Sequence, residues 1–183
     1  MSTDKNLYFL AIIPPEPIKS ETQEVKQIFA DQYDSKGALK SPPHVTLHMP
    51  FKLKVEKEND IIKKLKLLAV HQQSFEMVLN GFGHFKQRVI YLDVEQNESL
   101  FNLFLEIRKF MKVNYNIFNA DYKNRGFHPH LTVAFRDLSK EKFKEAWPLF
   151  EDRSFRRPFT AYAIALLKHN GTNWDVACEL PFS

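Results

Sequence analysis

Apolar and polar positions alternate along the chain in short segments that predict strands and helices in turn. The apolar, β-rich run over residues 6–13 predicts a buried strand. Apolar residues then recur at helical spacing over residues 17–33, which predicts an amphipathic helix. After a loop over residues 37–43, residues 45–51 predict a second strand. A second helix is expected to follow, capped by Asn59 or Asp60.

The middle of the chain repeats this order. Residues 75–82 and 89–94 predict two strands joined by a glycine-rich turn over residues 81–84. Residues 89–94 resemble the first strand, and Asn97 can cap a helix over residues 98–111. A polar loop then leads to a strand at about residues 131–135. Because strand, helix, loop and strand occur twice, we expect two lobes related by a pseudo-twofold axis.

The last part of the chain predicts one more helix and two strands. The helix follows Ser139 and ends near Pro148, and the strands span residues 155–167 and 174–180. Asn170 and Gly171 form a strong hairpin signal between those strands. Low-complexity segments and long linkers are missing from the sequence, so we expect residues 1–183 to form a single bilobal domain.

Composition narrows the class of protein. The chain has 183 residues and one cysteine, Cys178, which excludes an internal disulfide and a cysteine-rich zinc site. A net charge of +4 favours anionic ligands without requiring nucleic acid. The apolar stretch over residues 7–13 is too short to span a bilayer and lacks the features of a signal peptide. We therefore expect a cytoplasmic protein without a membrane partner, with a monomer favoured.

Two segments share an unusual pattern, in which a histidine after proline is followed two residues later by threonine. The first contains His44 and Thr46, and the second contains His130 and Thr132. With seven histidines and six threonines in 183 residues, chance alone gives about 0.2 such pairs. Residues two apart on a strand point to the same face, so each histidine is expected to share a face with its threonine.

The paired residues suit chemistry on a phosphate. Imidazole titrates near neutrality, so two facing histidines can act as base and acid in one turnover. Threonine hydroxyls can hold the non-reacting phosphate oxygens between them. RNA offers a substrate because its 2′-hydroxyl can form a strained cyclic phosphate. Imidazolium and hydroxyl donors can carry the negative charge, so we expect neither a metal nor another cofactor.

The doubled segments resemble the paired signatures of the 2H phosphoesterase superfamily, and in particular its 2′-5′ RNA ligase and cyclic nucleotide phosphodiesterase members. The resemblance covers roughly residues 7–135, and residues 79–92 resemble the family's glycine-rich turn and central strand. It implies an α+β fold of two pseudo-twofold-related lobes, with antiparallel sheets and flanking helices around a central cleft. It also implies opening of 2′,3′-cyclic phosphates of nucleotides or RNA ends to 2′-phosphates, or the reverse 2′-5′ ligation.

By this resemblance His44 and His130 are the catalytic pair, and Thr46 and Thr132 bind the phosphate. The resemblance leaves open which histidine is the base. Many members have an arginine soon after the second threonine, whereas Arg136 here comes one residue later than expected. By strand alternation Arg136 shares a face with Thr132 and could still contact substrate.

Other residues near the motifs have less specific interpretations. By strand alternation His48 and His128 also lie on the motif faces, so a metal site formed by four histidines is a rival hypothesis to the acid–base site. We favour His48 as a hydrogen-bond donor in the cleft wall. Phe85 could stack on a base or simply close the core. Lys123 and Arg125 could meet a phosphate tail, although a solvated loop is the simpler interpretation. The lysines after the first motif are most simply a solvated surface (Lys52, Lys54, Lys63, Lys64 and Lys66).

The sequence therefore predicts a metal-independent phosphoesterase acting on a 2′,3′-cyclic phosphate of a nucleotide or RNA end. The alternative is a nucleotide- or phosphate-binding module without useful turnover, because the same residues would bind the phosphate. The physiological substrate and the balance of hydrolysis against ligation do not follow from these motifs.

Overall fold

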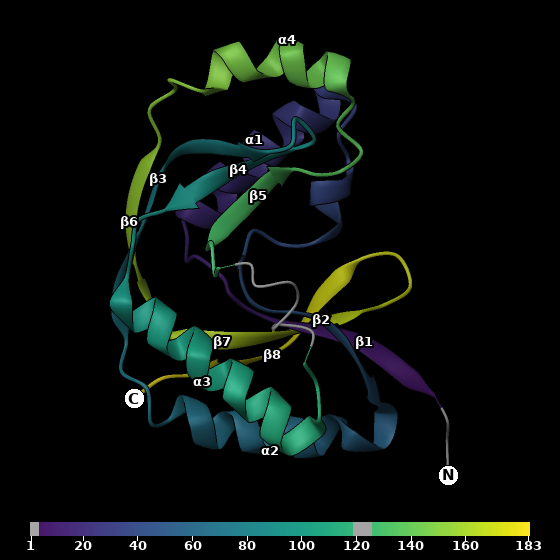
Figure 1. The fold of residues 1–183 in the computed structure, drawn as a ribbon, viewed down its shortest axis with the longest axis vertical. Helices are drawn as coiled ribbons and strands as arrows, with labels where there is room; N and C mark the ends of the chain where they lie inside the picture. Colours follow the sequence, from purple (N-terminus) through teal and green to yellow (C-terminus); the bar gives the residue numbers. More distant parts are fainter. Residues whose placement is uncertain (1–3, 119–125) are drawn as a thin grey trace.

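The computed structural model describes residues 4–118 and 126–183, whose strands form one curved antiparallel sheet (Figure 1). The strands are β1 (Lys5–Ile12), β2 (Val45–Lys54), β3 (Phe75–Phe85), β4 (Val89–Val94), β5 (His130–Ala134), β6 (Arg156–Ala161), β7 (Ala163–His169) and β8 (Trp174–Pro181). The helices are α1 (Ile18–Tyr33), α2 (Glu58–Ala69), α3 (Glu98–Tyr115) and α4 (Lys140–Phe150), with short 3-10 turns η1 (Gly37–Lys40) and η2 (Val55–Lys57).

The sheet consists of two four-stranded halves with matching order. The strand order is β6-β3-β4-β5-β2-β1-β7-β8, so the two motif strands, β5 and β2, lie side by side at the centre. A single register pair, Val45 opposite Leu131, joins them. In each half the motif strand is flanked by the strand that precedes it in the repeat, β4 or β1. This arrangement confirms the predicted α+β fold with two related lobes.

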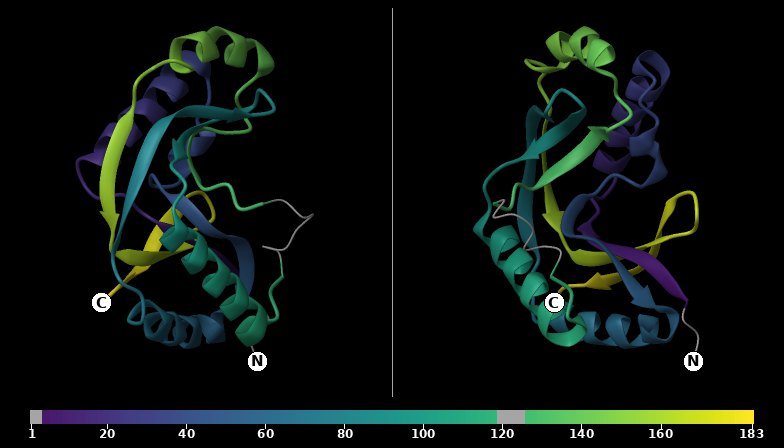
Figure 2. Two further views of the ribbon diagram at one scale, coloured as in Figure 1. Left: turned by 60° about the vertical axis from the view of Figure 1, so that its left-hand side comes forward. Right: turned by 45° about the vertical axis from the view of Figure 1, so that its right-hand side comes forward.

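Helices from each repeat pack against the motif strand of the other repeat. Helix α1 comes from the first repeat but packs against β5, and α3 comes from the second repeat but packs against β2. Figures 1 and 2 show α1 and α4 at the end of the molecule formed by β3, β4 and β5, with α2 and α3 at the opposite end. Each half of the sheet is therefore covered by a helix from the other repeat.

Strand β1 is buried on both faces, which explains its uninterrupted apolar sequence. Tyr8, Leu10 and Ile12 point to the main core between sheet and helices and are almost inaccessible to solvent. Phe9 and Ala11 point to the other face, where they pack in a second cluster with residues of β7. The second cluster lies next to the motif residues, because Ala11 lies opposite Thr46.

The predicted turn over residues 81–84 is wrong, because β3 continues through this segment to Phe85. The chain reverses instead over residues 86–88, where Lys86 and Gln87 have positive φ, as the central residues of a type I′ turn do, and the Arg88 amide donates to the Phe85 carbonyl at 3.1 Å. Gly81 has a φ of 73° and lies where the pairing of β3 with β4 is irregular. Gly81 therefore accommodates a bulge within β3 and does not mark a turn.

Other boundaries differ in ways that have simple causes. Residues 155–167 form two strands, because the chain leaves the β3 edge after β6 and crosses to pair with β1 as β7. The predicted cap of α2 is wrong, since the helix already begins at Glu58 after η2. The Asn97 cap is confirmed, with its side chain accepting a hydrogen bond from the Leu100 amide at 2.9 Å. The hairpin at Asn170 and Gly171 is also confirmed.

Candidate active site

The register between β2 and β5 brings the two motifs together. Val45 and Leu131 face each other and are completely buried on the core side of the sheet. Because the strands are antiparallel, this register places His44 opposite Thr132 and Thr46 opposite His130. Side chains alternate along each strand, so these four residues share the face opposite the core. The structure thus assembles one constellation from segments 86 residues apart.

Both histidines are held by the same local contact. The Nδ1 of His44 lies 2.7 Å from the carbonyl oxygen of Pro42, and the Nδ1 of His130 lies 2.8 Å from that of His128. A carbonyl can only accept, so Nδ1 carries the proton in each ring and Nε2 bears the lone pair of the neutral imidazole. The two histidines, which are related by the pseudo-twofold symmetry of the chain, therefore have the same tautomer.

Aromatic rings surround the two imidazoles. The ring centroid of Phe9 lies 4.7 Å from that of His44, and those of Phe85 and Tyr91 lie 5.0 and 5.1 Å from that of His130. Gly83 makes room for Tyr91, because a Cβ at this position would lie 2.5 Å from the tyrosine ring. Phe85 is 37% exposed, so it combines a contact to the histidine with a face open to solvent.

These surroundings lower the pKa of both histidines. Burial, together with the nearby charges of Lys26 and His130, lowers the pKa of His44 to about 4, against the opposing effect of the Pro42 carbonyl. Burial and the charge of His128 lower the pKa of His130, whereas the carbonyl of His128 and the charge of Asp93 raise it. The environment of His130 therefore favours protonation more than that of His44 does.

Lys26 is a functional candidate that the sequence analysis did not identify. Its side chain is 1% exposed, and its ammonium group donates to the carbonyl oxygens of Ala38 at 3.1 Å and Ser41 at 2.9 Å. These carbonyls flank the turn that leads to Pro42, the residue that holds His44. A signal was present in the sequence, since Lys26 lies between Thr22, Val25 and Phe29 on the buried stripe of α1.

A second set of contacts ties the two motif loops together. The hydroxyl of Ser35, after α1, donates to Asp137 at 3.0 Å, and the Gly37 amide donates to the other carboxylate oxygen of Asp137 at 2.7 Å. Ser35 also accepts a hydrogen bond from the amide of Phe135 at 3.1 Å. The segment before the first motif is thereby attached to the segment after the second motif.

Two predicted contact residues lie away from this constellation. His48 is 1% exposed and lies opposite Leu10, a core residue, because the pairing of β1 with β2 is irregular on both sides of this position. Its ring packs edge-on against Phe51 in the main core. Arg136 is exposed in a turn after the end of β5, with its guanidinium over Phe135, so strand alternation does not extend to it.

His128 and the basic loop residues complete the set of sequence candidates. His128 contacts Phe85 and Tyr91, and its Nε2 lies 3.2 Å from a carboxylate oxygen of Asp93. Lys123 and Arg125 lie outside the described residues. Within residues 4–118 and 126–183, no three side chains of His, Cys, Asp or Glu are grouped so that they could hold a metal ion.

A curved sheet with one histidine from each half at its centre defines a class of two-lobed α+β protein with a candidate acid–base site. The sequence model described as the 2′-5′ RNA ligase superfamily matches residues 14–173. The chain therefore belongs to this superfamily, which confirms the resemblance to the 2H phosphoesterases. Among the helices that the structure describes, none combines the length and apolar character needed to cross a membrane.

Relatives agree with this assignment, and solved structures share the fold. A provisionally named phosphoesterase of Geobacillus sp. (strain WCH70) is 30% identical over 142 residues, which cover 76% of this chain and 75% of the relative. Another from Geobacillus kaustophilus is 27% identical and covers 92% of both chains. The fold is similar to TT0787 of Thermus thermophilus (TM-score 0.69, 18% identity, 96% and 97% of the two chains). It is also similar to E. coli LigT complexed with 3′-AMP (TM-score 0.64, 22% identity, 98% and 99%).

Proposed function

We propose that this protein is a phosphoesterase that opens 2′,3′-cyclic phosphates of nucleotides or RNA ends to 2′-phosphates. The observation that carries the proposal is the matched pair of imidazoles. Both rings donate from Nδ1 to a backbone carbonyl, and each lies directly opposite a threonine on the adjacent strand. The proposal is supported by superfamily membership and by the 3′-AMP complex of the structurally similar LigT.

In the proposed hydrolysis His44 is the base and His130 is the acid. His44 lies near the Lys26 cation and has a pKa of about 4, so it is the imidazole that stays unprotonated. Its Nε2 takes a proton from water as the water oxygen bonds to phosphorus. The bond from phosphorus to O3′ breaks, and the Nε2 proton of His130 passes to O3′. The products are a 2′-phosphate and a 3′-hydroxyl.

The threonines and aromatic residues have complementary roles in this proposal. The hydroxyls of Thr46 and Thr132 donate to the non-bridging phosphate oxygens and stabilise the charge that develops on them. Phe85 offers a partly exposed ring beside His130 on which a base could stack. In ligation a 5′-hydroxyl would replace water as the nucleophile. His44 would take its proton as its oxygen bonds to phosphorus, and His130 would protonate the departing O3′, so the histidines would keep their roles and the product would be a 2′-5′ link.

The test is hydrolysis of 2′,3′-cyclic AMP followed by phosphorus NMR, which distinguishes 2′- from 3′-phosphate products. His44→Ala and His130→Ala are each expected to reduce turnover by about 10²–10⁴-fold, the usual contribution of a general acid or base. His71→Ala is the matched control, because His71 is an exposed residue beyond α2. Chelation with EDTA should leave turnover unchanged. Full activity in both catalytic variants would refute the mechanism, and ligand shifts without product would support a binding module instead.

The pH dependence provides an independent test of the assigned roles. In the free enzyme, kcat/KM requires neutral His44 and protonated His130. It should therefore be greatest between about 4 and the ordinary histidine pKa of 6.5. A bound phosphate anion stabilises imidazolium, so the basic limb of kcat should lie at higher pH than that of kcat/KM. A basic limb of kcat/KM well above pH 7 would contradict the lowered pKa of His130.

A further inference from the structure

The two motif histidines differ in the residue that lies opposite them on the flanking strand. The register of β4 with β5 places Asp93 directly opposite His130. In the other half of the sheet, continuing the register of β1 with β2 by one residue places Ile13 opposite His44. Ile13 packs in the apolar cluster around Phe9. The pseudo-twofold symmetry of the site is therefore broken, because a carboxylate stands at one of these two equivalent positions and an apolar side chain at the other.

The carboxylate of Asp93 is held beside His130 by two donors. Its Oδ1 atom accepts a hydrogen bond from the Val94 amide at 3.0 Å and lies 3.2 Å from Nε2 of His128. A carboxylate can only accept, so His128 presents Nε2 as a donor. The carbonyl oxygen of the same His128 lies 2.8 Å from Nδ1 of His130. His128 therefore contacts Asp93 through its ring and His130 through its backbone.

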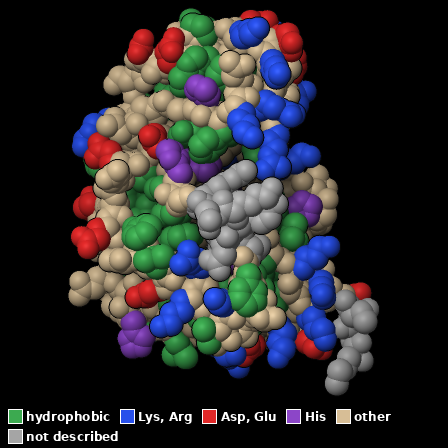
Figure 3. Space-filling model, in the orientation of Figure 1, with side chains coloured by type: hydrophobic (Ala, Val, Ile, Leu, Met, Phe, Trp, Pro, Cys, Tyr) green, Lys and Arg blue, Asp and Glu red, His purple; other side chains and the backbone are tan. Residues whose placement is uncertain are grey.

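The contact between His128 and Asp93 adds little to the stability of the fold. The two side chains are 50% and 46% exposed, and ion pairs at this level of exposure are weak. Histidine and hydrophobic side chains lie together near the middle of one face of the molecule, with an acidic side chain beside them (Figure 3). The place of Asp93 beside His130 therefore needs an explanation other than stability.

Titratable groups face the ring of His130 from β4, from β2 and from the segment before β5. Within the described residues, β4 contributes Asp93 and Tyr91, the segment before β5 contributes His128, and β2 contributes His44. Burial and the charge of Asp93 raise the pKa of Tyr91, so its phenol is neutral. His44 is also neutral near pH 7, because its pKa is about 4. In this set Asp93 is the group whose charge stabilises the imidazolium form of His130 against burial.

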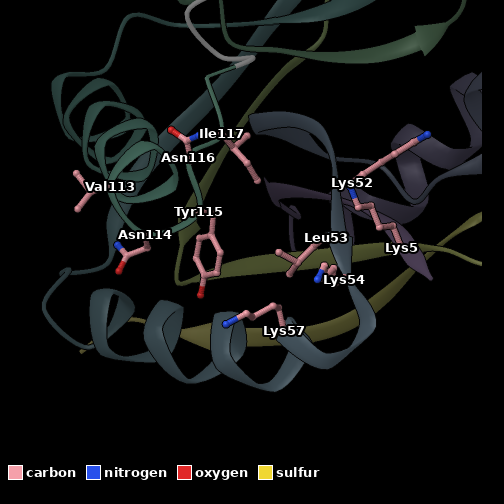
Figure 4. Close-up of a pocket in the computed structure, with 10 residues that line it drawn as sticks. All are labelled: Lys5, Lys52, Leu53, Lys54, Lys57, Val113, Asn114, Tyr115, Asn116 and Ile117. Atoms are coloured by element: carbon pink, nitrogen blue, oxygen red, sulfur yellow. The ribbon is translucent and has the colours of Figure 1, made fainter. Parts of the chain in front are cut away.

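The lysines at the other end of β2 are too distant to affect the histidines. Lys52, Lys54 and Lys57 line a cavity of about 420 Å³ next to the end of α3 (Figure 4). At about 3.3 Å per residue, Lys54 lies about 30 Å along the chain from His44. Physiological salt screens exposed charges beyond about 8 Å. The electrostatic difference between the two histidines therefore depends on their immediate neighbours.

We propose that Asp93 is a positioning residue that holds His130 in the protonated form required of the acid, while His128 anchors the Asp93 carboxylate. Opposite residues of an antiparallel pair have Cβ atoms about 4.5–5.5 Å apart, close enough for the charge of one to act on the other. Ile13 provides no such charge to His44, which stays neutral and acts as the base. The inference rests on the proposed function, because it concerns the acid of that reaction.

The test compares a variant that loses the charge of Asp93 with one that keeps it. Asp93→Asn keeps an oxygen that can accept from His128 but is neutral, and Asp93→Glu retains the carboxylate. Asp31→Asn is the matched control, because Asp31 is an exposed carboxylate on α1 that also accepts from a side chain, that of Gln27. NMR titration of the His130 ring without substrate gives its pKa. Initial rates with 2′,3′-cyclic AMP between pH 4 and 9 give kcat/KM.

In Asp93→Asn the pKa of His130 should fall by about 0.5–1 pH unit, the effect of one charge at about 5 Å in partly aqueous surroundings. The basic limb of kcat/KM should move to lower pH by the same amount, because less His130 is protonated at a given pH. Above this limb kcat/KM should fall about three- to tenfold, with little change below it. Asp93→Glu should retain most of the wild-type profile. Asp31→Asn should match the wild type, and the melting temperature should stay nearly constant in all three variants.

An unchanged pKa of His130 in Asp93→Asn would overturn the inference. A loss of kcat/KM that is equal at every pH would also overturn it, because that result would indicate a purely structural role. His128→Gln keeps a side-chain donor for Asp93 and removes a group that can carry a like charge, so its basic limb should lie at or above that of the wild type. A fall as large as in Asp93→Asn would assign the effect to His128 and overturn the inference.

Failure of the proposed function has a different signature. The wild type would then leave 2′,3′-cyclic AMP intact at every pH. The titration of His130 is measured without substrate, so it would still decide whether Asp93 keeps this imidazole protonated.

Discussion

Replacing Lys26 with methionine tests whether a buried charge supports the loop of the first histidine. Lys26 is enclosed by protein and donates to two carbonyls just before Pro42. Burial lowers its pKa from 10.5 to about 7. Methionine has a similar length and no charge, so Lys26→Met removes the titration while nearly preserving the volume.

The size of the effect follows from the shift in pKa. The folded protein releases the Lys26 proton near pH 7, whereas the unfolded chain holds it until about 10.5. Between these values the unfolded state binds more protons, so stability rises with pH. A difference of about 3.5 pH units at about 1.36 kcal/mol each amounts to about 5 kcal/mol. This stability is present above pH 10.5 and is lost as the pH falls to 7.

Urea denaturation of both proteins between pH 6 and 11 measures this difference. Other groups that titrate in this range are present in both proteins. Subtracting one curve of stability against pH from the other therefore isolates the contribution of Lys26. The wild type should gain several kcal/mol relative to Lys26→Met as the pH rises. Parallel curves would refute the reasoning. In the same variant, NMR titration should show the pKa of His44 rising from about 4, because a nearby cation is gone.

Three further substitutions test separate parts of the structure. Gly83→Ala should destabilise the protein by about 1–3 kcal/mol and reduce turnover, because the new methyl group displaces Tyr91 from beside His130; unchanged kinetics would show that this ring is dispensable. Ser35→Ala should cost about 1–3 kcal/mol in thermal or urea denaturation, since the buried Ser35 hydroxyl no longer accepts from the Phe135 amide or donates to Asp137. Asn97→Ala should cost about 1 kcal/mol through loss of the α3 cap without altering turnover, and a large activity loss would contradict a purely structural role.

The sequence predicted the fold and the motif pair because both depend on local patterns. Alternation and helical spacing determine which segments become strands and helices, and the doubled His-x-Thr pattern stands out from chance. The position of His48 could not be predicted, because two irregularities in the pairing with β1 change which face its side chain occupies. Alternation holds only where the pairing is regular, and bulges depend on contacts between strands far apart in sequence.

Glycine was the most misleading signal in the chain. The pair Gly81 and Gly83 resembled a turn, but one accommodates a bulge and the other makes room for a ring from the neighbouring strand. Lys26 was overlooked for a different reason. Its position on the buried stripe of α1 was visible, but its carbonyl partners lie in a loop whose path the sequence does not specify.

The exchange of helices between the repeats has a consequence for how the chain can be divided. Helix α1 packs against β5, and α3 packs against β2, so each repeat supplies the cover for the other's motif strand. A fragment ending after α2 would contain the complete first motif but would lack α3, the helix that packs against β2. The complementary fragment would lack α1, the helix that packs against β5. The two fragments would have to associate to bury these surfaces. Reassembly of the halves and restoration of the histidine pair would then be a single event.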